Sequence, residues 1–556
     1  MKTWKTNLEE TKQRYINWWN HKGIILSMWE HFQEGVKPHA DIAPPAPARD
    51  LSQKWFDPQW RAEYLDWYVA HSSLMADMLP VANTQLGPGS LAAILGGVFE
   101  GGEDTIWIHP DPNFNDEIVF NPEHPNWLLH KELLKACKAK ANGNYFVGMP
   151  DLMEGLDVLA ALKGTDMVLL DTVMQPEVLE QQMQQINDIY FKVFDELYDI
   201  IREGDEMAFC YFSSWAPGKM SKLQSDISTM ISQDDYRRFV QPFIREQCQK
   251  IDYTLYHLDG VGAMHHLPAL LEIEELNAIQ WTPGVGEPQG GSPKWYDLYK
   301  KILAGGKSVM ACWVTLEELK PLLDHIGADG VHLEMDFHNE REVEQAMRII
   351  EEYTGSSSSV SADVHTNQPV GEQDNAQESI RIREEKSQEE DRMKPLYDAI
   401  VAGKLEPAVE VTKDAIAAGV LPQDIINGYM ITAMGEVGQR FQDGKAFVPQ
   451  LLMAGRAMKG ALELLKPLLA GNASATIGKI VIGTVKGDLH DIGKNLVASM
   501  LEGCGFEVIN IGIDVTCDKF VEAVKENKAD ILCMSALLTT TMTYMQDVIR
   551  ALEEAG

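Results

Sequence analysis

The sequence lacks several features that would place a protein in a special class. Its 556 residues include only seven cysteines, without paired spacing, which argues against a disulfide framework and favours a reducing compartment. No run of roughly 18 or more apolar residues occurs, and the first ten residues have no apolar core, so we expect neither a membrane span nor a secretory leader. Together these absences predict a soluble, cytoplasmic protein.

Basic residues are also scarce. Lysine and arginine number 48 against 83 aspartates and glutamates, which gives a formal net charge of -35 at pH 7. This balance argues against nucleic acid or an anionic membrane surface as a partner. Hydrophobic residues make up 45% of the chain, which suffices for globular packing, and the length exceeds what one core fills. We therefore expect two or three domains.

The first 355 residues alternate apolar strands with amphipathic helices, which indicates an α/β barrel or a doubly wound sheet. Polar and aromatic clusters follow several strands directly, which favours a TIM-type (β/α)8 barrel because its active site forms at the C-terminal strand ends. The strand-like runs include residues 144–149, 207–212, 253–258, 278–281 and 331–334, and the helical segments include residues 176–203, 233–250 and 340–354.

The composition then changes twice. Residues 356–389 are rich in Ser, Gln, Asn and charge, which predicts a disordered linker between domains. Residues 390–472 show apolar positions at helical spacing only, which predicts a small helical bundle. The remaining segment, residues 473–556, forms the last predicted domain, after a barrel domain at residues 1–355.

The last domain begins with a βαβ pattern. An apolar run at residues 479–483 and a second at residues 506–512 flank a helical segment, and the first loop carries Asp488, His490 and Gly493 in an Asp-x-His-x-x-Gly pattern. A neutral histidine is a metal ligand, an aspartate can fix its tautomer, and glycine admits a bulky group. A helix-capping aspartate with a chance histidine is the alternative for the motif alone.

With its flanks, this loop resembles the base-off, His-on cobalamin-binding signature of corrinoid proteins and B12-dependent methyltransferases. The resemblance implies a Rossmann-like (flavodoxin-like) domain in which His490 is the lower axial cobalt ligand, Asp488 tunes it, and Thr541 is a third member of the relay. The third strand resembles the Ser-x-Leu segment that lines the channel for the nucleotide tail, which implies cofactor contacts from Ser535, Leu537, Thr539 and Thr541.

The helical bundle resembles the cap domain of the same corrinoid proteins, above all at residues 434–441 and 447–451. The resemblance implies that Met434, Val437 or Phe441 shields the upper cobalt face, whereas their spacing by itself favours plain bundle core. After Thr541 only one helix follows before Gly556, so we expect an incomplete last domain, truncated at its C-terminus, that binds cobalamin weakly or not at all.

In the predicted barrel, His257 and Asp259 lie two residues apart on a strand, so their side chains share a face. Glu334 ends a later strand, and these three side chains can hold Zn²⁺ with one position open for substrate; Asp336 is a reserve ligand. Ordinary polar lining or a metal-free acid/base pair are the alternatives. Cys312 is a ligand or nucleophile, or else core filler.

Residues 1–355 resemble the uroporphyrinogen decarboxylase superfamily, and most closely its methyltransferase branch. That branch carries a zinc site of the form His-x-Cys with a late Cys, where this sequence has Asp259 and Glu334. The harder ligand set suits an oxygen or nitrogen ligand rather than a thiol. Trp215, Trp281 and Trp313 at strand ends can form an aromatic box for a methoxyarene or a quaternary ammonium, or pack under loops.

These resemblances imply a fusion of a methyltransferase barrel with its corrinoid carrier. We expect it to move a methyl group from a small methylated substrate (O-, N- or S-methyl) to cob(I)alamin, with a second methyltransferase and a reductive activase as partners. One alternative is the reverse half-reaction, from methyl-cobalamin to an acceptor. Another is a corrinoid carrier with an inert barrel.

Overall fold

The structure is a computed structural model of the whole chain. It describes residues 4–32, 35–102, 105–111, 114–284, 286–354, 386–469, 478–488, 492–503, 506–536 and 539–555. The chain forms two compact units, unit 1 at Met1–Ser356 and unit 2 at Ser357–Gly556. Among the helices that the structure describes, none combines the length and the apolarity needed to cross a membrane.

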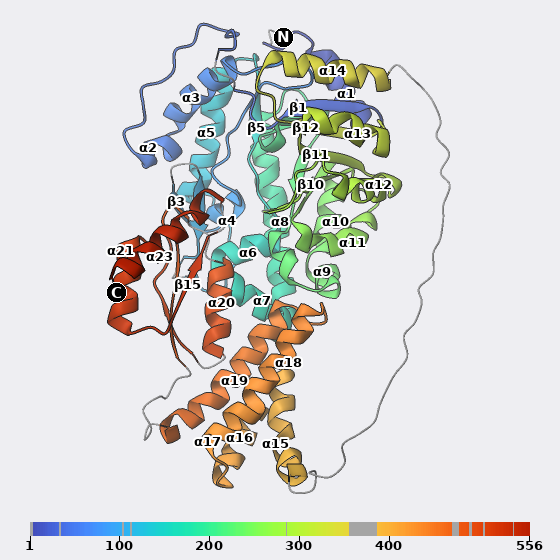
Figure 1. The fold of residues 1–556 in the computed structure, drawn as a ribbon. Helices are drawn as coiled ribbons and strands as arrows, with labels where there is room; N and C mark the ends of the chain where they lie inside the picture. The colour runs from blue at the N-terminus through green and yellow to red at the C-terminus, as the bar shows by residue number, and fades with distance from the viewer. Residues whose placement is uncertain are drawn as a thin grey trace. The chain divides into compact units, whose positions relative to one another are not determined.

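The larger sheet of unit 1 has six parallel strands in the order β1-β12-β11-β10-β9-β8. Most of these strands are buried along their whole length, as is typical of a parallel sheet covered on both faces. In Figure 1 they run through the middle of unit 1. Their bounds are β1 Ile24–Met28, β8 Met220–Leu223, β9 Tyr253–Asp259, β10 Ala278–Thr282, β11 Ser308–Val314 and β12 Val331–Met335.

A second sheet has the order β2-β5-β6-β7, with only its last pair antiparallel, and β3 and β4 form a separate antiparallel ribbon. Within the described ranges, the strand pairs of unit 1 thus form separate sheets rather than one ring, so the (β/α)8 barrel stays a prediction. The bounds are β2 Val81–Ala82, β3 Val98–Gly101, β4 Ile106–His109, β5 Phe146–Met149, β6 Met207–Phe209 and β7 Ser214–Ala216.

One predicted strand of unit 1 ends early, and one predicted helix is interrupted. The strand predicted at residues 207–212 stops at Phe209, because the backbone is already helical at Cys210 (φ -70°, ψ -34°) and continues into the 3₁₀ turn η1 (Tyr211–Ser213), where Phe212 has a left-handed φ of 61°. The helix predicted at residues 233–250 breaks at Val240. Pro242 causes this break, since it has no N–H to donate to the preceding turn.

The helices of unit 1 mostly follow the strands along the chain, and α12 packs against β11. Thr315 and Glu318 form a capping box at the start of α13. The helices are α1 Leu8–Trp19, α2 Leu51–Phe56, α3 Pro58–Ala70, α4 Ser90–Ile94, α5 Pro125–Ala141, α6 Gly155–Lys163, α7 Thr165–Met174, α8 Pro176–Ile201, α9 Gln233–Phe239, α10 Gln241–Lys250, α11 Leu267–Leu271, α12 Tyr296–Ala304, α13 Leu316–Ile326 and α14 Glu340–Thr354, with the 3₁₀ turns η2 Asp226–Met230, η3 Val261–His266 and η4 Pro293–Trp295.

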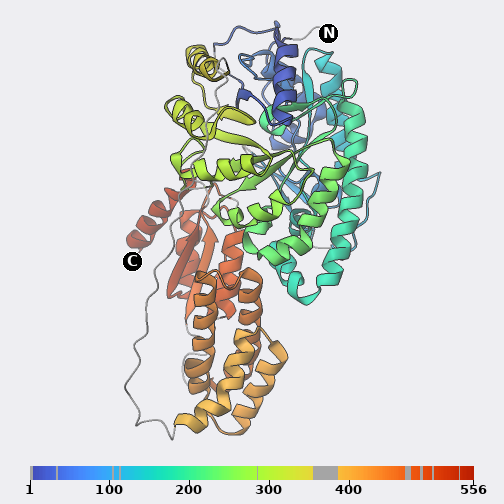
Figure 2. The ribbon, with the colours of Figure 1, turned by 90° about the vertical axis from the view of Figure 1, so that its right-hand side faces the viewer.

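Unit 2 begins with the predicted helical bundle, whose long helices run alongside one another in orange in Figures 1 and 2. Most of the predicted linker lies outside the described residues, but its last residues, from Lys386, already belong to α15. The bundle consists of α15 Lys386–Val401, α16 Leu405–Ala417, α17 Pro422–Ile425, the π-helical turn η5 Ile426–Met430, α18 Ile431–Gln442 and α19 Val448–Leu469.

The second part of unit 2 is a Rossmann-like α/β domain with a parallel three-stranded sheet in the order β14-β13-β15. The first strand is central, so the loop after it stands where open α/β sheets bind ligands. The elements are β13 Lys479–Thr484, α20 Ile492–Gly503, β14 Glu507–Asn510, α21 Cys517–Asn527, β15 Ile531–Ser535, α22 Thr539–Met542 and α23 Tyr544–Ala555.

Candidate functional site

The imidazole of His257 is held in one orientation by the neighbouring strand. In the parallel pairing of β9 with β10, His257 stands opposite Gln280, and its Nδ1 is hydrogen-bonded to the amide oxygen of Gln280. The amide nitrogen of Gln280 donates to Thr282 Oγ1 at 2.8 Å and to Cys312 Sγ at 3.1 Å. The amide oxygen is therefore the acceptor, so the proton lies on Nδ1 and the Nε2 lone pair is left for a ligand.

Burial keeps this imidazole neutral. It lowers the pKa of His257 to about 3, with a further lowering from the Lys222 ammonium and a partial offset from Gln280. A neutral ring is the form that binds metals or accepts a proton. His257 is thus available as a ligand or acceptor throughout the physiological pH range.

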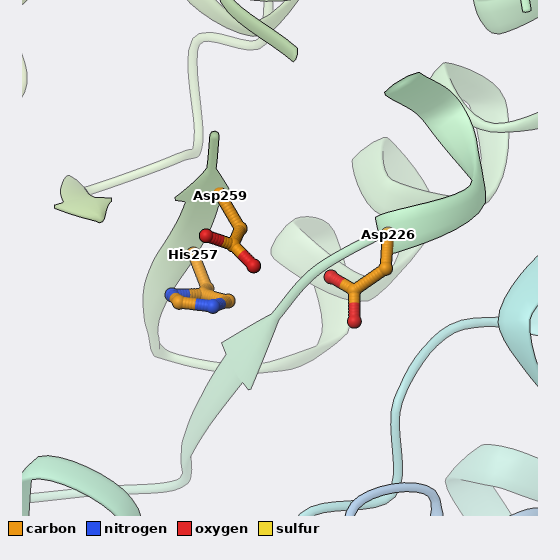
Figure 3. Close-up of side chains that lie close together, drawn as sticks. All are labelled: Asp226, His257 and Asp259. Atoms are coloured by element: carbon orange, nitrogen blue, oxygen red, sulfur yellow. The ribbon is translucent and has the colours of Figure 1, made fainter. Parts of the chain in front are cut away.

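Two carboxylates approach this imidazole (Figure 3). One potential ligand atom each from Asp226, His257 and Asp259 lies within 4.8 Å of the others. Asp259 lies two residues after His257 on β9, as predicted, whereas Asp226 comes from η2, the turn after β8. Within the described ranges this is the one group of three or more histidine, cysteine or acidic side chains that can hold a metal ion.

Asp226 is placed by hydrogen bonds of its segment to α6 and by one hydrogen bond within that segment. Its backbone N–H donates to Asp157 Oδ2 at 2.8 Å, and the N–H of Ile227 donates to Asp157 Oδ1 at 3.0 Å. Gln224 Nε2 donates to Asp226 Oδ2 at 2.9 Å. Asp226 was not predicted from the sequence, although the run of polar residues directly after the strand β8 was a usable signal.

The surroundings of the three side chains carry excess negative charge. The buried ammonium of Lys222 pairs with Asp151, and it is the one cation that lowers the pKa values of both Asp226 and Asp259. The pKa of Asp226 is raised to about 6, chiefly by burial and also by Asp259 and Asp151, against the lowering by Lys222. Asp226 stands at the exposed edge of the group, so water offsets part of this rise. A cation is the ligand that this charge balance favours.

Glu334, the predicted third ligand, does not join this group. It is fully buried on β12 opposite Cys312, and neither carboxyl oxygen has a hydrogen-bond partner of ordinary geometry among the described residues. Burial raises the pKa of Glu334 to about 8, and the side chain of Cys312 acts against this rise. A carboxyl that stays protonated at neutral pH is a poor metal ligand. In the observed group, Asp226 takes its place.

The other side chains considered from the sequence take structural positions. Burial raises the pKa of the Cys312 thiol well above its usual range, and the thiol accepts a hydrogen bond from Gln280, which agrees with core filler rather than a nucleophile. Asp336 is exposed outside the group. Trp215 and Trp281 are core residues, which agrees with the alternative of packing rather than with an aromatic box.

A cavity of about 760 Å³ lies next to this group in unit 1. Tyr211 and Phe212 line the cavity, and their ring centroids lie 6.2 and 6.0 Å from that of His257. The cavity is within the usual size range of small-molecule sites. Two lining residues of a space large enough for a substrate thus lie beside His257.

In unit 2, the structure describes two of the three residues of the predicted relay. Asp488 is fully buried after β13, and Thr541 Oγ1 in α22 donates to Asp488 Oδ2 at 2.7 Å. His490 and Leu537 lie outside the described residues, and only the backbone of Thr539 is described. The structure therefore brings together the aspartate and the hydroxyl that the resemblance joins to His490.

Two other predicted cofactor positions of unit 2 are Ser535, at the end of β15, and Gly493, at the start of α20. Ser535 ends β15, and its backbone oxygen accepts from Val485 N at 3.0 Å. A Cβ added at Gly493, in the first turn of α20, would meet no atom of the described residues within 4 Å. No packing within the described part of the chain thus requires glycine at position 493.

The bundle residues predicted to shield the cofactor differ in exposure. Val437 is 2% exposed and packs with Ala446, Leu451 and Ala454, so it is bundle core rather than a ligand contact in this structure. Met434 is partly buried against the same group. Phe441 is 45% exposed, which leaves it as the predicted shielding residue with a free face.

Comparison with known proteins identifies the module in unit 2. Residues 478–556 match the family described as B12 binding domain, and residues 393–466 match a second family with the same description. Trimethylamine corrinoid protein 1 of Methanosarcina mazei is 45% identical over 161 residues, which are 29% of this chain and 74% of that protein. Dimethylamine corrinoid protein 1 of Methanosarcina acetivorans is 47% identical over 152 residues, which are 26% and 71%.

A solved structure gives a match of the same extent. The methanol:cobalamin methyltransferase complex MtaBC from Methanosarcina barkeri is 33% identical, with a TM-score of 0.28, over 32% of this chain and 70% of that chain. The identity and coverage of the relatives, together with the two domain matches, lead to one conclusion. Through its residues 393–556, this chain belongs to the family of B12-binding corrinoid proteins.

Proposed function

We propose that this protein is a corrinoid-dependent methyltransferase that moves a methyl group from a small methylated donor to a cobalamin bound by its own unit 2. The observation that carries the proposal is the pairing, in one chain, of a corrinoid-protein module with the group Asp226, His257 and Asp259 beside a cavity. The first supplies a methyl acceptor, and the second supplies a site that can act on a donor.

The proposal assigns unit 1 the task of improving a poor leaving group. When the bond between methyl and heteroatom breaks, the electron pair stays on the heteroatom, which then needs a proton or a cation. Asp226 and Asp259, with Nε2 of His257, could hold Zn²⁺ and leave one ligand position for the heteroatom of the donor. Without a metal, the raised pKa of Asp226 suits a proton donor. Both routes use the same three side chains.

Cobalamin is assigned to unit 2, where reduced cobalamin supplies the nucleophile that accepts the methyl group. The chain would hold it through His490, whose imidazole Asp488 would orient, with Thr541 holding the carboxylate in place. Ser535, Leu537 and Thr539 would line the path of the nucleotide tail, and Phe441 would cover the upper face. The burial of Asp488 and the open space at Gly493 fit this assignment.

Three finer assignments belong to the same proposal. Unit 1 would be a (β/α)8 barrel of the uroporphyrinogen decarboxylase superfamily. The donor classes are O-, N- and S-methyl compounds; the methylamines in the names of the relatives of unit 2 make N-methyl donors an obvious part of any screen. A second methyltransferase would take the methyl group onward, and a reductive activase would keep the cofactor reduced.

The experiment that tests the proposal uses reduced, cobalamin-loaded full-length protein. We expect one class of methoxyarenes, methylamines or methyl thioethers to change its visible spectrum, and His257→Ala or Asp226→Asn to slow that change at least roughly 100-fold. A spectrum that no donor changes would instead favour a carrier with an inert unit 1, or the reverse half-reaction.

Metal analysis of the same variants separates the two routes. We expect about one zinc per chain in the wild type, its loss in Asp226→Asn, and its retention in Glu334→Gln, because a protonated Glu334 is no ligand. Retention of zinc in Asp226→Asn with loss in Glu334→Gln would restore the ligand set predicted from the sequence. Full activity without metal would leave Asp226 as the proton donor.

A further inference from the structure

Seven aromatic side chains line the cavity of unit 1. One wall holds Trp29, whose ring packs edge-on against Tyr211 and Phe212 at centroid distances of 4.8 and 5.4 Å. Another holds Trp60 stacked on Tyr64 at 5.4 Å, both from α3. Such rings, already fixed by their neighbours, favour a flat apolar ligand body. The aromatic residues that line the cavity are Trp29, Trp55, Trp60, Tyr64, Tyr68, Tyr211 and Phe212.

One buried cation lies in this aromatic lining. Arg61, on α3, is 8% exposed, lines the cavity, and sits with its guanidinium carbon 5.1 Å from the ring centroid of Trp55. Its Nη2 donates to the backbone oxygens of Asn83 and Gln85 at 3.3 and 3.2 Å. These contacts fix the guanidinium but leave its charge without a counter-ion.

Arg61 is incompletely satisfied by the described part of the chain. No carboxylate there lies within ion-pair distance of the guanidinium, and its buried Nε–H has no acceptor. The other charged side chains that line the cavity, Glu30 and Lys54, are exposed and half-buried respectively. A buried charge without a partner is costly, so an anion supplied by a ligand would stabilise the site.

The same charge selects against one class of donor. Aromatic walls alone would attract a quaternary ammonium, but a ligand cation beside the uncompensated guanidinium of Arg61 would be repelled. A neutral arene would fit the walls and leave Arg61 unpaired. A planar aromatic body with a carboxylate satisfies both the walls and the cation, and a guanidinium binds a carboxylate through two parallel hydrogen bonds.

Two residues of a strained turn contact both the cavity and the ring of His257. Tyr211 and Phe212 contact the cavity on one side and the ring of His257 on the other. Phe212 and Ser213 have left-handed φ values of 61° and 42°, a conformation that is costly for such residues and is often kept at functional sites. A ligand body in the cavity would therefore lie against the same two rings that contact His257.

We propose that the methyl donor is a methoxylated aromatic carboxylate, with its carboxylate paired to Arg61 and its ring between the aromatic walls. This inference rests on the proposed function of unit 1. In the reaction, the bond between oxygen and methyl breaks and its electron pair stays on the phenolic oxygen, which takes a proton or metal ion at the group of Asp226, His257 and Asp259. The methyl group forms its new bond with the electron pair of reduced cobalamin.

A binding experiment on the full-length protein tests the role of Arg61 without catalysis. All thirteen tryptophans lie in unit 1, so their fluorescence reports titration of this unit with 4-methoxybenzoate and with the neutral isostere 4-methoxybenzamide. We expect the acid to bind about 10-fold more tightly than the amide. Arg61→Gln should remove this preference while amide binding stays unchanged, and Arg61→Lys should keep part of it.

The amide serves as the internal control for folding of each variant. Equal binding of acid and amide by the wild type, equal weakening of both by Arg61→Gln, or preferred binding of trimethylamine or glycine betaine would overturn the inference. If Arg61→Gln does not fold, the wild-type preference and its reduction in Arg61→Lys decide the question. Failure of the proposed function looks different: the preference for the acid persists, but no donor changes the spectrum of the reduced holoprotein.

Discussion

Single residues of unit 1 show how burial sets the charge of its titratable groups. Burial lowers the pKa of His257 to about 3 and that of His332 to about 3, so both imidazoles are neutral. The same cause raises the pKa of Glu334 to about 8. The carboxyl groups nearest His257 are those of Asp226 and Asp259, and burial raises the pKa of both.

The protonated state of Glu334 leads to a prediction about stability. Folding raises the pKa of this carboxyl from 4.5 to about 8, so the folded state keeps a proton that the unfolded chain releases. The free energy of unfolding should therefore fall as the pH rises from about 4.5 to about 8. Glu334→Gln has no carboxyl group that ionises, so its free energy of unfolding should not show this decrease. Between pH 5 and pH 8 we expect the free energy of unfolding of the variant to rise by a few kcal/mol relative to that of the wild type.

Tryptophan fluorescence during denaturant unfolding measures this difference, because all thirteen tryptophans belong to unit 1. The informative quantity is the gap between the glutamine variant and the wild type at each pH. A gap that stays constant from pH 5 to pH 8 would mean that Glu334 is ionised in the folded protein, and it would reopen its role as a ligand.

Among the elements, α18 presents two apolar side chains in opposite environments. Val437 faces the bundle core, whereas Phe441 is 45% exposed. We expect Val437→Ala to destabilise the bundle by roughly 2 kcal/mol, through lost burial and a residual cavity. Phe441→Ala should change stability by less than about 0.5 kcal/mol.

Hydrogen exchange of amides in α18 and α19 measures both effects in the full chain. If Phe441 covers the cofactor, as proposed, its alanine variant should alter cobalamin affinity without altering exchange rates. The idea fails if Phe441→Ala leaves cobalamin binding untouched, or if Val437→Ala leaves the exchange of α18 unchanged.

The contact between α22 and the loop after β13 gives a second prediction for elements. Thr541→Val removes the 2.7 Å hydrogen bond to the buried carboxylate of Asp488 but keeps the size of the side chain. Since partners behind a metal ligand tune its affinity, we expect cobalamin binding to weaken roughly 10-fold. Thr541→Ser keeps the hydroxyl and should bind like the wild type, so equal weakening in both variants would point to packing instead. Equilibrium titration with cobalamin, followed by absorbance, measures this.

For the whole molecule, the main property is that two compact units share one chain. Each has its own core: unit 1 around its sheets and unit 2 around its bundle and its Rossmann-like domain. Covalent connection makes the encounter of donor site and cofactor intramolecular, which raises their effective concentration. This holds for any arrangement of the units that lets them meet.

The benefit of connection can be measured with a protease site inserted between residues 356 and 385. At nanomolar protein, cleavage should slow donor-dependent methylation at least roughly 10-fold, and the loss should shrink as the concentration rises. The uncut protein with the same insertion is the control. Rates that do not respond to cleavage at any concentration would indicate that the covalent connection contributes nothing.

Much of the local structure follows from local patterns. The apolar runs of β5, β9, β10 and β12 and the helical spacing of the bundle were recognisable, because strand and helix periodicity is written in neighbouring residues. The placing of His257 and Asp259 on one face also followed from period two along a strand. The strand β6 ended early at Phe209, before the turn with the left-handed Phe212, and the helix predicted at residues 233–250 broke at Val240, before Pro242. Periodicity registers neither feature.

The sequence by itself determined the βαβ order of the corrinoid module and the His257-x-Asp259 pair, because both depend on residues close together in the chain. Only the tertiary structure decided that Asp226 joins that pair, that Glu334 is buried without a charge partner, and that Arg61 faces an aromatic cavity. The physical reason is that burial and charge depend on which strands and helices become neighbours, and that is settled by packing between segments far apart in the chain.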